Sequence, residues 1–127
     1  MMFADTSYIL ALLVSNDERH ERAVALSKDI SEKLVSTDHV LSEFVTIVSK
    51  RAGNKAAYVL GANLLKSEFD FVYCDAETMS LALDFIRRHP GISMCDAISA
   101  AVMKSMGMKK ILSFDCDFYK LGFVRVC

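Results

Sequence analysis

Short runs rich in β-branched and aromatic residues alternate along the chain with longer runs whose apolar residues recur every three or four positions. The short runs are Met1–Ala4, Leu34–Ser36, Phe69–Cys74, Lys110–Phe114 and Gly122–Val126. Strands that alternate with helices in this way form a parallel sheet through right-handed crossovers. The sequence therefore predicts an α/β fold, a parallel sheet of about five short strands with helices on both faces.

Capping and breaking residues bound the predicted helices. Asn16 and Asp17 are expected to begin a helix that runs to about Ile30, after a first helix that follows Thr6 and Ser7. Further helices are predicted after Thr37 or Asp38, after the Gly53–Asn54 break, after Asp75 and after Ser93, with Pro90 and Gly107 as stops.

The length and the composition indicate one soluble domain over residues 1–127. The 127 residues are 53% hydrophobic, enough for a single core and too few for two ordinary domains. The uncharged stretches are too short to cross a bilayer, and no basic and apolar leader begins the chain, so we expect a cytoplasmic protein without a membrane partner. The four cysteines form no CxxC pair, so neither a zinc cage nor a redox pair is indicated.

Acidic residues are expected to collect at one edge of the predicted sheet. Asp5 follows the first strand, Glu43 lies in the helix after the second, and Asp96 lies in the first turn of the alanine-rich helix. Asp115 and Asp117 follow the fourth strand. Because the carboxyl ends of parallel strands meet at one edge, these carboxylates are expected to converge and repel one another. Oxygen ligands of this kind suit Mg²⁺ or Mn²⁺.

Each of these acids also has a purely structural interpretation. Asp5 would serve as a helix N-cap, Asp96 as part of a capping arrangement at the start of its helix, and Asp115 and Asp117 as turn residues. Glu43 fits such an interpretation less well. It borders the apolar face of its helix, where an unpartnered carboxylate is unfavourable.

Four segments in this order resemble the acidic pattern of PIN domains, in particular that of the small VapC-like ribonuclease toxins. The segments are Phe3–Ser7, Val40–Glu43, Ser93–Ala101 and Ile111–Phe118. The resemblance covers essentially the whole chain and implies a single PIN-like nuclease domain.

The resemblance also implies a role for individual residues. Metal-binding and catalytic roles are implied for Asp5, Glu43, Asp96 and Asp115, and supporting roles for Thr6, Ser113 and Asp117. The choice between Asp115 and Asp117 as the fourth ligand stays open. Ser113 stands where threonine is more usual in the family, which keeps the hydroxyl.

The function implied is that of a metal-dependent endoribonuclease that cleaves RNA phosphodiesters with metal-activated water. Its cofactor would be Mg²⁺ or Mn²⁺, and its partners an RNA substrate, a small antitoxin protein and a second copy in a homodimer. Two alternatives stay open: a PIN-fold RNA-processing nuclease outside a toxin-antitoxin pair, and a PIN module that binds or scaffolds without turnover.

The net charge of −1 shows no basic field of the kind that nucleic-acid binders carry. Without the five candidate acids, however, fifteen basic residues face eleven acidic ones, a balance of +4 around an acidic pit. Candidate phosphate contacts are Lys50, Arg51, Lys55, Arg87 and Arg88, for which solvated helix faces are the competing interpretation. A metal pair of His39 with Glu43, four residues apart on one helix, is a further alternative.

Overall fold

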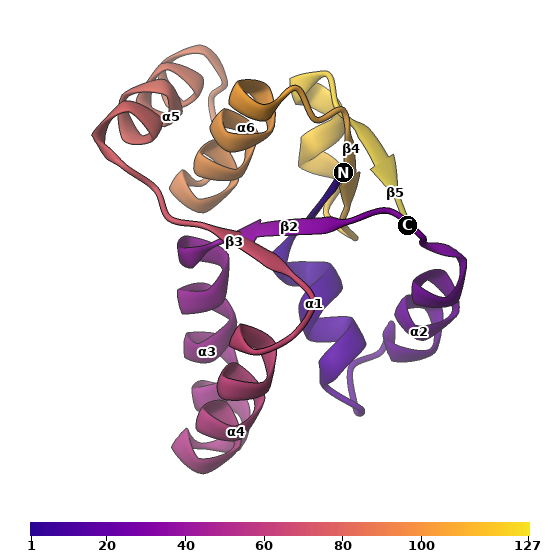
Figure 1. The fold of residues 1–127 in the computed structure, drawn as a ribbon. Helices are drawn as coiled ribbons and strands as arrows, with labels where there is room; N and C mark the ends of the chain where they lie inside the picture. Colours follow the sequence, from indigo (N-terminus) through magenta and orange to yellow (C-terminus); the bar gives the residue numbers. More distant parts are fainter.

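A parallel sheet of five strands in the order β3-β2-β1-β4-β5 runs through the middle of this computed structural model (Figure 1). The structure describes the backbone of residues 1–127 and every side chain except those of Cys116, Asp117 and Tyr119. The strands are β1 Met2–Ala4, β2 Leu34–Thr37, β3 Asp70–Val72, β4 Lys110–Leu112 and β5 Val124–Val126. The predicted parallel sheet is thus confirmed, although four of its strands are shorter than expected and β2 is one residue longer.

Helices cover both faces of the sheet, as the sequence predicts (Figure 1). One face carries α1 Thr6–Leu13, α2 His20–Asp29, α3 Asp38–Ala52 and α4 Asn54–Leu65. The other carries α5 Ala76–Arg88, α6 Met94–Met106 and the short 3-10 helix η1 Cys116–Leu121. The core between these layers buries Phe3, Tyr8, Phe44, Ile111 and Phe118 completely or almost so.

The strand order reverses direction beside β1. The chain moves outward from β1 to β2 and β3, and then returns to place β4 on the other side of β1, where Phe3 pairs with Ile111 and Ala4 with Leu112. Crevices at such reversal points, beyond the carboxyl ends of the strands, are the usual ligand sites of open α/β sheets. Just beyond β1, the amide of Asp5 donates a hydrogen bond to the carbonyl of Leu112 in β4 at 3.0 Å, which extends the pairing of these two strands.

Three predicted helix caps are confirmed in atomic detail. Thr37 accepts a hydrogen bond from the amide of Val40 at the start of α3, and Asp75 accepts one from Thr78 at the start of α5. Ser93 caps α6 by accepting from the amide of Asp96 at 3.1 Å.

The predicted start of the second helix is wrong. The helix α2 begins at His20, because the Asp17 carboxylate closes a turn by accepting from the amide of Arg19 at 2.9 Å. The guanidinium of Arg19 then donates to the carbonyl of Phe114 at 3.2 Å and lies 5.3 Å from the centre of its ring. The segment before α2 therefore anchors the loop after β4, a contact between distant parts of the chain.

The loop after β4 also differs from the prediction. The fourth strand ends at Leu112 and not at Phe114, because Ser113 turns toward β1, and the helix η1 follows. Asp117 lies in this helix, with its side chain outside the described residues, so its supporting role stays a prediction.

The described part of the chain holds no helix with the length and apolar surface that crossing a bilayer requires.

We expect Gly61→Ala to destabilise the protein although alanine favours helices. A Cβ atom at Gly61 would lie 2.8 Å from Cγ2 of Val45, where α4 packs on α3. Overpacking of this kind costs about 1–3 kcal/mol, against a gain of up to about 1 kcal/mol in helix propensity. Urea unfolding of Gly61→Ala, Val45→Ala and the double variant measures the coupling. The clash predicts that Gly61→Ala costs less stability in the Val45→Ala background; additive losses would contradict it.

Candidate active site

Four of the five predicted acids line one pocket at the junction of β1 and β4. The pocket encloses about 340 Å³. We call it the acid pocket, and its lining residues are Asp5, Thr6, Ser7, Leu10, Glu43, Ile47, Gly91, Ser93, Asp96 and Asp115. These acids come from α3, from α6 and from the segments that follow β1 and β4, so the fold brings together residues from both ends of the chain.

Two serine hydroxyls hold the buried carboxylate of Asp5. Oδ2 of Asp5 accepts hydrogen bonds from Ser7 at 2.9 Å and from Ser113 at 2.8 Å, and the two hydroxyl oxygens lie 3.2 Å apart. The same oxygens accept backbone hydrogen bonds, Ser7 from the amide of Phe114 and Ser113 from the amide of Asp115. This network joins the start of α1 to the loop after β4 and fixes where Asp5 points.

The surroundings of the pocket oppose the ionisation of two of its acids, Asp5 and Asp96. Burial raises the pKa of Asp5, although its hydrogen bonds to Ser113 and Ser7 act in the other direction. The pKa of Asp96 rises to about 7, first because of burial and then because of the negative charges of Asp5, Asp115 and Glu43. The pocket therefore holds more negative charge than its protein surroundings compensate.

Glu43 forms the boundary between the acid pocket and a second hollow. It lies in the second turn of α3, and the second hollow, of about 530 Å³, is lined by Glu43, His39 and Cys95 among others. Burial, followed by the charges of Glu43, Asp5 and Asp96, raises the pKa of the Cys95 thiol. Cys95 thus lines the second hollow as a thiol that burial and the acids nearby keep protonated.

Sequence reasoning missed Ser7, which lines the acid pocket, and Cys95, which lines the second hollow beside it. Ser7 had a sequence signal, since a hydroxyl two positions after Asp5 at the start of a helix is well placed to return to the carboxylate. Cys95 had only its position beside Asp96, because its nearness to Glu43 arises from the packing of α6 near α3.

The donor atoms of the acid pocket fit a hard divalent cation. All four acids offer oxygen, and Oγ1 of Thr6 is buried there without a hydrogen-bond partner among the described residues. Among the described side chains, these acids do not bring three ligand atoms within 4.8 Å of one another. This spacing suits Mg²⁺, which usually keeps several water ligands and binds one or two carboxylates directly.

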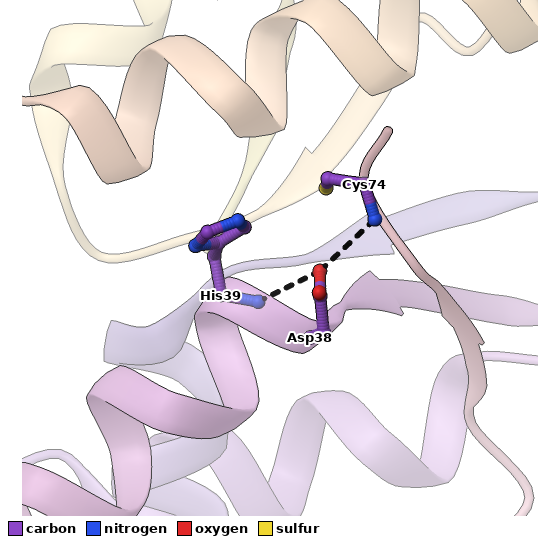
Figure 2. Close-up of side chains that lie close together, drawn as sticks. All are labelled: Asp38, His39 and Cys74. Carbon is purple, nitrogen blue, oxygen red and sulfur yellow. Dashed lines mark hydrogen bonds between the residues drawn. The ribbon is translucent and has the colours of Figure 1, made fainter. Parts of the chain in front are cut away.

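A separate cluster of softer donors lies at the start of α3 (Figure 2). One ligand atom from each of Asp38, His39 and Cys74 lies within 4.8 Å of the others. Oδ1 of Asp38 accepts from the amide of His39 at 3.1 Å and from that of Cys74 at 3.3 Å, which joins α3 to the segment after β3. Sulfur and imidazole suit zinc better than magnesium. His39 thus lies near Asp38 and Cys74, and it also lines the second hollow with Glu43, so the alternative metal pair of His39 with Glu43 stays a prediction.

The five basic candidates lie in different surroundings. Lys50 lines the second hollow beside Glu43, and Arg88 lines a further hollow that shares Gly91 with the acid pocket. Arg51 pairs with Asp17 at 3.8 Å and Arg87 with Asp84 at 3.3 Å. Lys55 is exposed in the first turn of α4. The structure thus places Lys50 and Arg88 beside the site, while the ion pairs of Arg51 and Arg87 are ordinary surface contacts.

Comparison with known protein families identifies the family of this chain. The family model described as PIN domain matches residues 2–124. The chain belongs to the PIN domain family. This PIN domain is 34% identical over 128 residues to the 23S rRNA-specific endonuclease VapC20 of Mycobacterium tuberculosis, covering 99% of this chain and 98% of the relative.

Solved structures show the same fold. The crystal structure of Mycobacterium tuberculosis VapC20, described as a Sarcin-Ricin loop cleaving toxin, matches this PIN domain with a TM-score of 0.92 at 32% identity, over 99% of this chain and 98% of that one. FitAcB from Neisseria gonorrhoeae matches with a TM-score of 0.75 at 20% identity, over 100% and 97% of the two chains. The latter likeness concerns the fold alone.

We expect Asp96 to titrate near neutral pH in the metal-free protein. The pKa of Asp96 is about 7 in the folded protein against an ordinary 3.8. Between these two pH values the folded protein therefore keeps a proton on Asp96 that the unfolded chain has lost. The contribution of Asp96 to stability therefore falls as the pH rises from about 4 to about 7. Carboxyl-carbon NMR of labelled protein measures the midpoint. Asp5→Asn should lower it by removing a facing charge, while Asp84→Asn, on the exposed surface of α5, should not; a midpoint near 4 in the unaltered protein would contradict the electrostatic picture.

Proposed function

We propose that this PIN domain is a metal-dependent endoribonuclease and the toxin of a toxin-antitoxin pair. The observation that carries the proposal is the acid pocket, where burial raises the pKa of Asp5, and burial together with the charges of Asp5, Asp115 and Glu43 raises the pKa of Asp96. A divalent cation stabilises negative charge that is buried and that the surrounding protein does not compensate. Identity of 34% over nearly the full length to an rRNA endonuclease supports the same activity.

Asp5, Glu43, Asp96 and Asp115 would hold Mg²⁺ or Mn²⁺. When bound, such an ion lowers the pKa of a water molecule and offsets charge on a phosphodiester. The residues of this chain orient the site. Ser7 and Ser113 fix the Asp5 carboxylate, and Thr6 supplies a buried hydroxyl beside it.

Ribosomal RNA is the substrate class that we propose to test first. The relative VapC20 is named as specific for 23S rRNA and as cleaving the Sarcin-Ricin loop. Glu43, Asp96 and Asp115 of the acid pocket are half-buried, whereas Asp5 is buried, so three of the four acids are partly exposed to a polymer that does not enter the protein. Cleavage of another RNA class in preference to ribosomal RNA would favour the RNA-processing alternative.

We expect Asp5→Asn and Asp96→Asn each to reduce RNA cleavage about 100-fold or more. Each removes a charge that faces the others in the acid pocket, and losses of this size are typical when one electrostatic contact to the reacting group is removed. The measurement is the rate of cleavage of ribosomes and of isolated rRNA by purified protein with Mg²⁺ or Mn²⁺. Excess EDTA should abolish the activity.

The matched control is Asp70→Asn, which removes an exposed acid that pairs with Lys33 at 3.4 Å on the surface. Circular dichroism of every variant checks that the fold persists. Cleavage that survives EDTA, or that Asp96→Asn leaves intact in a folded protein, would contradict the metal-dependent mechanism. A folded unaltered protein that binds RNA and cleaves none would support the alternative of a non-catalytic module.

A small antitoxin protein is the partner that the proposed toxin activity requires, because an active ribonuclease harms the cell that makes it. The name of VapC20's crystal structure describes that relative as a toxin. The inhibitor would act by covering the acid pocket or by occupying an apolar groove on the surface.

We further propose a homodimer formed through α4. Three large apolar side chains on this helix are exposed: Tyr58 by 76%, Val59 by 48% and Leu65 by 50%. Together they form an apolar surface of the kind that a second copy covers.

Val59→Asp should convert the protein to a monomer at micromolar concentration, as measured by light scattering after size exclusion. Leu83→Asp, at a site exposed by 58% on α5, should leave the mass unchanged; a monomeric unaltered protein would contradict the proposal.

A further inference from the structure

A small hollow of about 270 Å³ lies directly beside the acid pocket. We call it the cationic hollow, and it is lined by Arg88, His89, Pro90, Gly91, Ile92, Lys120 and Leu121. One wall is the end of α5 with the loop that leads to α6, and the other is η1, which follows β4. The hollow is therefore built from the same two connections that carry Asp96 and Asp115 to the acid pocket.

A single loop separates the two sites. Gly91 lines both of them, and Ser93, two residues later, already belongs to the acid pocket. Gly91 has a φ of 89°, a conformation that side-chain-bearing residues rarely adopt. A chain of phosphates that leaves the acid pocket across Gly91 would meet the cationic hollow next.

The two sites differ sharply in charge. The acid pocket carries four carboxylates, whereas Arg88 and Lys120 line the hollow and none of its described lining residues is acidic. His89 adds a polar ring, held by stacking on Phe85 with ring centres 5.9 Å apart. A hollow with cationic walls next to an acidic site suits an anion that is anchored away from the reacting atoms.

The neighbouring arginine shows what an ordinary surface contact looks like on this helix. Arg87 forms an ion pair with Asp84 one turn back, at 3.3 Å. Arg88, the last residue of α5, lines the hollow. Adjacent arginines of the same helix end thus have different surroundings, and only one lies beside the acid pocket.

We propose that the cationic hollow binds a backbone phosphate of the RNA next to the phosphodiester held at the acid pocket. This subsite rests on the proposed ribonuclease function. It anchors the strand through charge, with no contact that distinguishes one base from another. Arg88 and Lys120 are its binding residues, and Gly91 lets the strand pass close to the loop backbone.

The test measures binding and therefore does not depend on turnover. In the Asp96→Asn background, a short single-stranded RNA labelled with a fluorophore is titrated and followed by anisotropy. The pair Arg88→Ala with Lys120→Ala should raise the Kd about tenfold, the scale expected for two solvent-exposed charge contacts. It should also flatten the dependence of log Kd on log salt by ~0.7, since each phosphate of a single strand that the protein neutralises contributes ~0.7.

The matched control removes the same two residue types elsewhere. Arg22, whose guanidinium bonds the carbonyl of Cys127, and Lys33, which pairs with Asp70, are both replaced by alanine. This control should leave Kd and the salt slope close to those of the parent. An equal loss of RNA affinity in the two double variants would show a general effect of charge and would overturn the subsite.

A second measurement locates the phosphate. RNAs in which one phosphate at a time is replaced by a neutral methylphosphonate should reveal one linkage whose neutralisation weakens binding. That penalty should vanish in the Arg88→Ala, Lys120→Ala pair, and a penalty that persists there would overturn the proposal. If the unaltered protein cleaves no RNA, the proposed ribonuclease function fails, but the dependence of the methylphosphonate penalty on Arg88 and Lys120 still tests the subsite. If the protein binds no RNA, the subsite fails as well.

Discussion

The buried carboxylate of Asp5 is the constraint on which the rest of this site depends. It is 4% exposed, at the point where β1 and β4 meet, and hydroxyls from both ends of the chain hold it. Burial penalises its charge more strongly than the hydrogen bonds support it, so its pKa is raised. Its charge in turn raises the pKa values of Asp96 and Cys95, and the neighbouring side chains are organised around that field.

Three sites of different chemistry are present in the described part of the chain. The acid pocket presents oxygen ligands for a hard cation, the cluster of Asp38, His39 and Cys74 presents softer donors, and the cationic hollow presents Arg88 and Lys120. The backbone hydrogen bonds that Asp38 accepts give the softer cluster a structural role in joining α3 to the segment after β3. The opposite charges of the adjoining pocket and hollow fit a polyanion that reacts at one point and is held at another.

Prediction from sequence succeeded at three helix starts that a few neighbouring residues decide. The caps Thr37, Asp75 and Ser93 were predictable because each bonds an amide three residues ahead. The start of α2 was mispredicted because Asp17 closes a turn and Arg19 reaches the loop after β4. The helix η1 and the early end of β4 escaped prediction for the same reason, since the turn of Ser113 toward Asp5 joins residues 108 positions apart.

The sequence by itself determined the alternation of strands and helices, the acids at their junctions and the family to which they point, because periodicity, capping and motif order are properties of short segments. Only the tertiary structure decided which acids share a pocket, that Ser7 lines it with them, and that Cys95 and Arg88, but not Arg87, line hollows beside it. The physical reason is that desolvation and Coulomb interaction act through space. A pKa near 7 at Asp96 depends on facing charges brought there from both ends of the chain by the reversal of strand order.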